Sequence, residues 1–134
     1  MFTAEQQKEI FKTIQQNEEK TSGIIHVHIR KKCKQNVLKD AQKYFIKAKL
    51  NKSKYKNAVL IFIGETSRKF AILGDTAIHE HCQQEFWDNS RDLLTKHLKQ
   101  EKYLEGIIAT INEIGSRLEK HFPINKGDSH IEDL

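Results

Sequence analysis

The apolar residues of this chain repeat with two different periods, and the change between them predicts a mixed α/β architecture. Ile10 and Ile14 recur at helical spacing after Thr3, which suits an N-cap, so a first helix is expected to end near residue 17. Residues 23–30 then alternate between apolar and polar side chains. This alternation is typical of a strand with one drier face.

A crossover helix and two further strands are expected next. Apolar residues at helical spacing predict a helix over 36–48 with its lysines outward, and residues 58–64 and 70–74 are apolar on both alternating faces. The helix joins its two flanking strands in parallel, whereas the five residues between the second and third strands allow only an antiparallel hairpin. The sheet should therefore be small and mixed.

Two long helices follow, over 84–99 and 103–121, each with an apolar stripe. Gly106 and Gly115 lie inside the second of them and indicate close backbone packing rather than a break. The expected fold is a three-layer αβα sandwich in which a parallel βαβ unit precedes an antiparallel hairpin and two C-terminal helices.

The length of 134 residues suits one domain, which we expect to span residues 1–123, with a flexible C-terminal tail over 124–134. The longest apolar runs are too short for a membrane span, and the first residues lack the pattern of a signal peptide. We therefore expect a cytoplasmic protein. We also expect a monomer. Cys33 and Cys82 have no framework spacing, so free thiols are expected.

The net charge of +5 is unevenly distributed. Residues 30–56 hold eleven cations and only Asp40 as an acid, a local net charge of +10 that leaves −5 for the rest of the chain. Such a segment can attract nucleic acid or an anionic surface. Ten of the eleven cations are lysines and no aromatic motif for base stacking accompanies them, so a solvated face is the simpler interpretation and nucleic acid is not the expected partner.

The predicted topology brings distant residues to one edge of the sheet. Because the third strand runs antiparallel to the second, its end at Gly74 and Asp75 should return to the edge where the first two strands begin. Residues before those strands, and those just after Asp75, should share this rim. The candidates are Glu19, Thr21, Gly23, Lys56, His79 and Glu80, with Trp87 as a further candidate.

Several chemistries can be weighed at this rim. The segment HEHCQ at 79–83 fails the zinc-protease pattern because Gln83 stands where a histidine is needed. A zinc site built from His79, His81 and Cys82 has unsuitable helical spacing, and a nucleophilic Cys82 or Ser22 has no supporting signature.

Oxygen chemistry is the more credible alternative at the rim. Asp75, Glu19 and Glu80, with Thr21, supply the ligands that Ca²⁺ or Mg²⁺ prefers. Asp75 or Thr76 can equally serve as a simple helix cap. Both interpretations remain open from spacing alone.

The runs TSGIIHVHI, VLIFIGETSRKFAILGDTAIHEHCQQEFWD and EGIIATINEIGSRLEKHFP closely resemble the TPM domain family, whose members include a thylakoid-lumen protein, a photosystem II repair factor and a modulator of acetylcholine receptors. The resemblance spans about residues 5–123. It implies an αβα fold, calcium binding by loops at one sheet edge in several relatives, and a weak acid-phosphatase activity ascribed to the plant lumen relative.

The residues that match the family pattern are Thr21, Gly23, Gly74, Asp75, Ile78 and Trp87. Two positions depart from it. Ile24 stands where the family often has Glu, and Ala77 where it often has Gly. The missing Glu removes a possible oxygen ligand, so an inherited metal site is expected to be weaker or to be completed by Glu19.

Three functions follow as expectations. The first is a Ca²⁺-binding interaction module with a protein partner at the rim. The second is a metal-assisted phosphomonoester hydrolase in which Asp75 and Glu19 hold the ion and Lys56 or Arg68 attracts the anion, Arg68 being the weaker choice because it belongs to the opposite end of the sheet. The third is a weak binder of nucleic acid or an anionic surface through residues 30–56.

Overall fold

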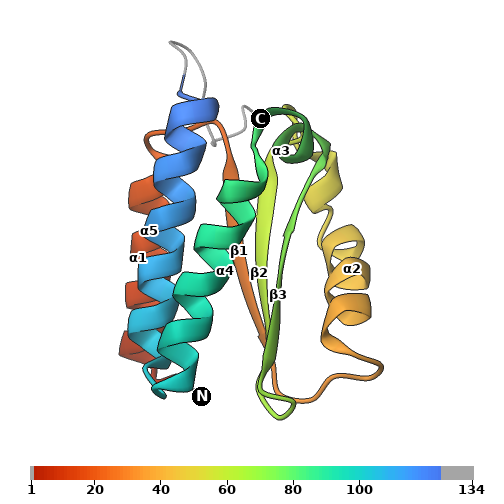
Figure 1. Cartoon of the computed structure of the whole chain (residues 1–134), viewed down its shortest axis with the longest axis vertical. Coiled ribbons are helices and arrows are strands. Elements are labelled where there is room, and N and C mark those ends of the chain that lie inside the picture. Colours follow the sequence, from red (N-terminus) through yellow and green to blue (C-terminus); the bar gives the residue numbers. More distant parts are fainter. Residues whose placement is uncertain (1, 125–134) are drawn as a thin grey trace. The chain divides into compact units, whose positions relative to one another are not determined.

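The computed structural model describes residues 2–124 and resolves them into two compact units (Figure 1). Unit 1 contains residues 2–23 and 82–124, and unit 2 contains residues 24–81. Unit 1 holds α1 (Ala4–Glu18), α4 (Gln84–Lys99) and α5 (Tyr103–His121). The elements of unit 2 are β1 (Ile24–Arg30), α2 (Val37–Lys47), η1 (Leu50–Lys52), β2 (Ala58–Gly64), β3 (Lys69–Gly74) and α3 (Thr76–His81).

The sheet of unit 2 has the order β1-β2-β3. β1 and β2 are parallel, with Ile24 opposite Ala58, and β2 and β3 are antiparallel, with Val59 opposite Gly74. Every residue of β2 is buried, whereas most of β3 is only half-buried. The parallel pair joined through a helix and the short antiparallel hairpin confirm the predicted topology.

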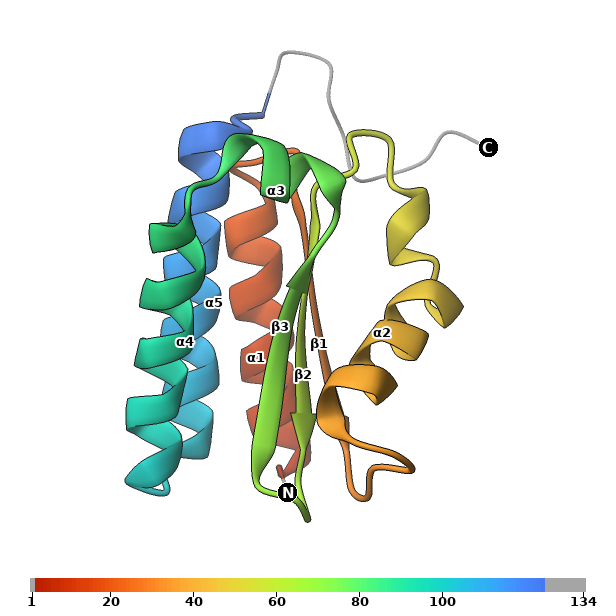
Figure 2. The same ribbon diagram turned by 45° about the vertical axis from the view of Figure 1, so that its right-hand side comes forward.

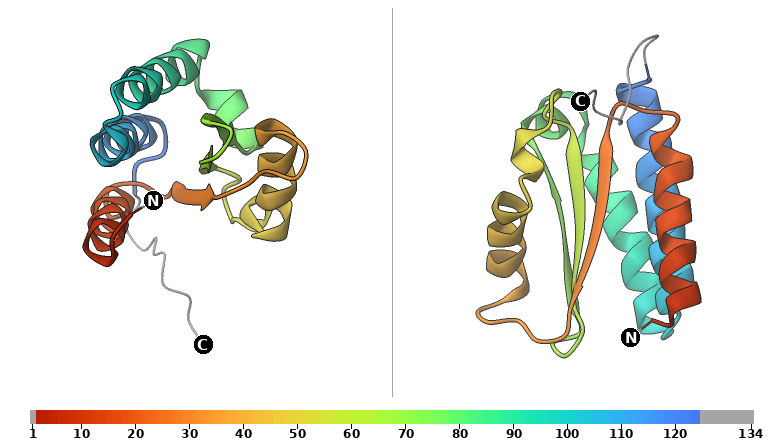
Figure 3. Two further views of the ribbon diagram at one scale, coloured as in Figure 1. Left: turned by 90° about the horizontal axis from the view of Figure 1, so that it is seen from below. Right: turned by 180° about the vertical axis from the view of Figure 1, so that it is seen from behind.

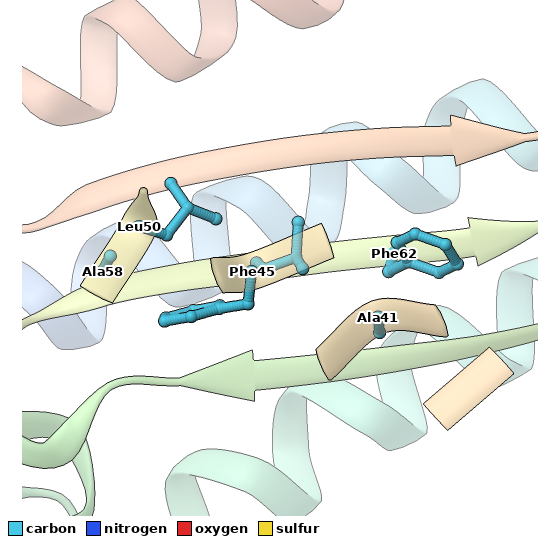
Figure 4. Packing of buried hydrophobic residues seen from close by; sticks show 6 residues of the cluster. Ala41, Phe45, Leu50, Ala58 and Phe62 are labelled. Atoms are coloured by element: carbon cyan, nitrogen blue, oxygen red, sulfur yellow. The ribbon is translucent and has the colours of Figure 1, made fainter. Parts of the chain in front are cut away.

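Helix α2 begins where its sequence provides a cap and packs its apolar stripe on the sheet (Figure 2). The side chain of Asn36 accepts a hydrogen bond from the Lys39 amide at 2.9 Å, which satisfies one of the free donors of the first turn. Ala41 and Phe45 of the helix join the side chains of the sheet in one core cluster (Figure 4). Its buried members are Ala41, Phe45, Leu50, Ala58, Leu60 and Phe62.

Unit 1 is a set of helices in which α5 packs against both α1 and α4 (Figure 3). α1 has the predicted capping box, since Thr3 Oγ1 accepts from the Gln6 amide and Gln6 Oε1 accepts from the Thr3 amide. A side chain on Gly115 would place its Cβ 2.0 Å from Oδ1 of Asn17. A Cβ on Gly106 would lie 2.6 Å from the Cβ of His97, so both glycines permit the close packing that was predicted.

Two local features differ from the sequence-based expectations. The short helix α3 was implied only by the cap interpretation of Asp75 or Thr76, because only Ala77 and Ile78 of its six residues are buried and so no apolar stripe predicts it. β3 was expected to be covered on both faces like β2, but most of its residues are only half-buried. A run of apolar residues cannot distinguish an edge strand from a central one, because strand order depends on pairing far along the chain.

The structure also tests the predicted helices and the predicted C-terminal tail. The helices over 36–48, 84–99 and 103–121 are present with nearly the expected bounds, and the α/β class is confirmed. Ile124 is described, whereas the rest of the predicted tail lies outside the described residues. Among the helices of residues 2–124, none combines the length and apolarity needed to cross a membrane.

Candidate functional site

Asp75 lies at the junction between β3 and α3 and organises both. Its amide donates to the carbonyl of Ala58 at 3.0 Å, which extends the pairing of β3 with β2 by one residue. Its carbonyl accepts from the amide of Ile78 at 3.0 Å, and its Oδ1 accepts from the amide of Thr76 at 2.7 Å. Asp75 therefore precedes α3, and its carboxylate bonds the first amide of the helix rather than the second or third amide that an N-cap side chain takes.

The second carboxylate oxygen of Asp75 is in a different situation. Oδ2 is buried and has no hydrogen-bond partner among the described residues. A buried acceptor without a donor is costly, because it has lost its water without gaining a replacement. Either an ion or an ordered water is the natural complement for such an atom.

The loop before β2 meets this junction. The carbonyl of Lys56 accepts from the amide of Ala77 at 2.9 Å, so the loop is tied directly to the first turn of α3. Lys56 has a left-handed backbone with φ of 54°, and its Nζ donates to the carbonyl of Asn51 at 2.6 Å. Lys56 is thus beside the junction as predicted, with its ammonium group held against the loop.

This loop adds polar atoms that the sequence analysis did not select. Asn51 Oδ1 and Ser53 Oγ are buried without a hydrogen-bond partner among the described residues. They belong to a lysine-rich segment whose composition indicates a solvated loop. Their burial depends on how η1 folds back, which local sequence patterns do not reveal.

α3 carries the other predicted rim residues of unit 2. The amide of His79 approaches the carbonyl of Asp75 at 3.4 Å, and the side chains of His79 and Glu80 are exposed. Within residues 2–124, no group of three or more His, Cys, Asp or Glu side chains is placed to hold a metal ion. Any ion at this junction would therefore take much of its coordination from neutral oxygens or water.

The rest of the predicted set belongs to unit 1. Glu19 follows the last residue of α1 and is exposed. Trp87 is half-buried on α4, with its ring edge-on to the buried ring of Phe86 at 5.0 Å between centroids. The set thus divides between the units: Gly74, Asp75, His79, Glu80 and Lys56 are in unit 2, and Glu19, Thr21, Gly23 and Trp87 are in unit 1.

Thr21 of unit 1 is fully buried and has a structural role. Its Oγ1 donates to the Leu118 carbonyl at 3.1 Å, lies within hydrogen-bond distance of the Phe122 carbonyl, and accepts from the amide of Gly23 at 3.0 Å. A Cβ on Gly23 would lie 3.0 Å from a methyl group of Leu118. Thr21 and Gly23 therefore join the turn after α1 to the end of α5.

A second polar cluster lies on the β1 face that α2 covers, and its contacts with Tyr44 were not predicted from the sequence. Nε2 of His26 and the hydroxyl of Tyr44 are 2.6 Å apart, and the ring of His28 stacks on the Tyr44 ring at 3.9 Å between centroids. Burial lowers the pKa of both histidines, and the positive charge of Arg30 lowers that of His28 further. Burial also raises the pKa of Tyr44.

The Cys82 thiol shows no sign of activation. Burial raises the pKa of the Cys82 thiol, and the nearby charge of Arg117 only partly opposes this effect. A raised pKa keeps the sulfur protonated and weakens it as a nucleophile. Cys33 and Cys82 are both free thiols, as predicted.

The mixed sheet with a parallel βαβ unit and an antiparallel hairpin places this chain among the α/β proteins. Residues 1–117 match the model of the TPM domain family. The chain therefore belongs to the TPM domain family. No curated protein matches it.

Two solved structures are similar to this one. The NMR structure of the BA42 protein from the psychrophilic bacterium Bizionia argentinensis is 34% identical, with a TM-score of 0.91, and the match covers 100% of this chain and 91% of that one. The solution NMR structure of the N-terminal domain of the cg2496 protein from Corynebacterium glutamicum is 16% identical, with a TM-score of 0.67, and covers 88% and 74%. The second likeness concerns the fold alone.

Proposed function

We propose that this TPM domain is a divalent-cation-binding interaction module that takes Ca²⁺ at the junction of β3 and α3 and presents the ion-loaded rim to a protein partner. The observation that carries the proposal is Asp75 Oδ2, a buried carboxylate oxygen with no hydrogen-bond partner among the described residues. A hard cation completes such an oxygen by direct coordination.

The oxygen atoms of the loop that is hydrogen-bonded to α3 favour Ca²⁺ over softer metals. Asn51 Oδ1 and Ser53 Oγ are buried neutral oxygens of the loop that is hydrogen-bonded to α3 through Lys56. Ca²⁺ accepts carbonyl, amide and hydroxyl oxygens with flexible geometry, whereas Zn²⁺ prefers nitrogen and sulfur. Glu80 of α3 is a further candidate ligand, and Mg²⁺ is the alternative ion.

The affinity should be modest. No group of three acidic or soft ligands exists within the described part of the chain, and Ile24 stands where relatives often have Glu. Fewer charged ligands mean weaker binding, so we expect a dissociation constant of roughly 0.1–1 mM, the range of weak calcium modules. Such a site would be occupied only where the calcium concentration is high.

The hydrolase alternative has less support in the geometry. Arg68 lies in the hairpin turn between β2 and β3, next to the pair formed by Gly64 and Lys69. Asp75 lies at the opposite end of β3. The ammonium of Lys56 is engaged with the Asn51 carbonyl. An anion-binding group beside Asp75 would thus need Lys56 to leave its present partner.

The test is an amide NMR titration with Ca²⁺ and then Mg²⁺. We expect shifts to concentrate at residues 51–57 and 74–80 and to disappear in Asp75→Asn, which keeps the shape of the side chain but removes its charge. Asp92→Asn, at an exposed carboxylate of α4, is the matched control and should titrate like the wild type. Absence of shifts at millimolar Ca²⁺, or equal shifts in Asp75→Asn, would refute the cation site.

A further inference from the structure

The ten lysines between residues 31 and 56 form a cationic segment that the proposed cation site does not explain. All ten are exposed. The single acid of the segment, Asp40, is only 2% exposed and accepts from the Lys34 amide at 2.7 Å while pairing with Arg30 at 3.5 Å. We call this surface the lysine face; its members are Lys31, Lys32, Lys34, Lys39, Lys43, Lys47, Lys49, Lys52, Lys54 and Lys56.

The burial of Asp40 leaves residues 31–56 with no exposed carboxylate of their own. The carboxylate of Asp40 is used inside the protein, where it also approaches the amide of Gln35 at 3.3 Å. No acidic side chain of the segment therefore reaches solvent beside the lysines. A surface of this kind raises the local concentration of anions and steers anionic partners to it.

Helix α2 adds exposed apolar side chains to the lysine face. Ile46 is 59% exposed and Leu38 is 50% exposed. At 100° per residue, Ile46 shares the outward side of the helix with Lys39 and Lys43, nearly opposite the buried seam of Ala41. It lies in a shallow surface depression lined by Gln35, Lys39, Gln42, Lys43, Ile46 and Lys47.

We propose that the outward side of α2 lies on an anionic membrane surface, with the lysines at the lipid phosphates and with Ile46 and Leu38 in the interfacial layer. Clustered lysines are attracted by acidic headgroups, and apolar side chains between them gain by leaving water. The buried seam of α2 stays on the sheet, so the contact is shallow and depends on lipid charge.

Nucleic acid fits this surface less well. Residues 31–56 contain lysines and no arginine, and a lysine acts as a point charge. Base recognition relies instead on the planar fork of arginine and on aromatic stacking. A phosphate backbone also gains nothing from Ile46 and Leu38. Exposed apolar residues beside the lysines, Ile46 next to Lys39 and Leu38 on the flank of the helix, are what a lipid surface uses and a duplex does not.

The test is flotation of the full chain with lipid vesicles, in EDTA so that the proposed cation site does not contribute. We expect binding to vesicles that contain phosphatidylglycerol, none to vesicles of phosphatidylcholine alone, and a marked loss between low salt and about 0.15 M salt. Each lysine at an anionic surface contributes about fivefold, so Lys39→Gln, Lys43→Gln and Lys47→Gln together should weaken binding roughly 100-fold.

A matched triple variant separates the lysine face from net charge. Lys8→Gln, Lys12→Gln and Lys20→Gln remove three exposed lysines of unit 1 and should leave vesicle binding close to the wild-type level. Leu38→Ser with Ile46→Ser should weaken binding roughly tenfold while keeping the charge.

Three results would overturn the proposal. They are equal binding to neutral vesicles, equal losses in the two triple variants, and tighter binding of duplex DNA than of anionic vesicles with the same dependence on Lys39, Lys43 and Lys47. The last result would make the lysine face a nucleic-acid surface. An unchanged affinity of the serine variant would refute the interfacial role of Ile46 and Leu38.

Discussion

Nε2 of His26 and the hydroxyl of Tyr44 lie 2.6 Å apart, which joins β1 to α2 by a polar contact inside unit 2. The same tyrosine ring stacks on His28, which in turn lies 5.5 Å from the ring of Phe62. Arg30 completes the row, with its guanidinium 5.2 Å from the Phe62 ring. Three cationic or titratable side chains of one strand face are thus held against aromatic rings.

This row should make stability fall in mild acid. Burial lowers the pKa of His26 and His28 below the ordinary value of 6.5, so the folded state favours the neutral rings. The unfolded chain therefore binds more protons just below pH 6.5, and the free energy of unfolding should decrease as pH falls from about 6.5 through the lowered folded-state pKa values. Urea unfolding at a series of pH values between about 7.5 and 5 measures this slope.

Two sets of variants test the cause of that slope. His26→Gln with His28→Gln should flatten it, whatever the change in absolute stability. His81→Gln, at an exposed position of α3, should leave it as in the wild type. A slope that persists in the double variant would assign the acid sensitivity to other groups.

Thr21 should contribute to stability through its hydroxyl rather than its methyl group. Thr21→Val removes the acceptor for the Gly23 amide and the donor to the Leu118 carbonyl, and we expect a loss of about 1–3 kcal/mol because a buried amide is left unpaired. Thr21→Ser keeps the hydroxyl and should cost at most about 1 kcal/mol. Equal losses in the two variants, measured by urea unfolding, would contradict this role.

Replacing Gly115 even with alanine should destabilise the protein. Its absent Cβ would lie 2.0 Å from Oδ1 and 2.8 Å from Cβ of Asn17, so Gly115→Ala should destabilise by about 1–3 kcal/mol despite the better helix propensity of alanine. Asn17→Ala clears part of that space. In a double-mutant cycle the combined loss should fall short of the sum by more than about 0.5 kcal/mol, and simple additivity would exclude the contact as the cause.

The periodic elements of the fold were predictable because burial of one face of a helix or strand places apolar residues at regular intervals in the sequence. α5 carries Ile107, Ile111, Ile114 and Leu118 at helical spacing, and all four are buried. α3 was implied only by its possible cap at Asp75 or Thr76, because a helix of six residues with two buried positions leaves no such period. The partial exposure of β3 was not predicted, because it depends on what covers the strand rather than on its own apolar residues.

The candidate site was predictable only to the extent that topology determines it. An antiparallel return of β3 necessarily brings Asp75 to the start of β2, and the Asp75 amide indeed reaches Ala58. The pairing of Tyr44 with His26 depends on the rotation of α2 about its axis above the sheet. Period alone does not give that rotation, so this contact could not be predicted.

The hydrogen bond between Thr21 and Leu118 joins residues that are 97 positions apart in the sequence. Helix α1 is therefore synthesised long before α5, the helix it packs against. At synthesis rates of about 5–20 residues per second, this separation corresponds to a wait of roughly 5–20 s on the ribosome. Unit 2, being a continuous segment between the two parts of unit 1, emerges whole during that interval. The apolar stripe of the nascent first helix is therefore open to chaperones throughout the synthesis of unit 2.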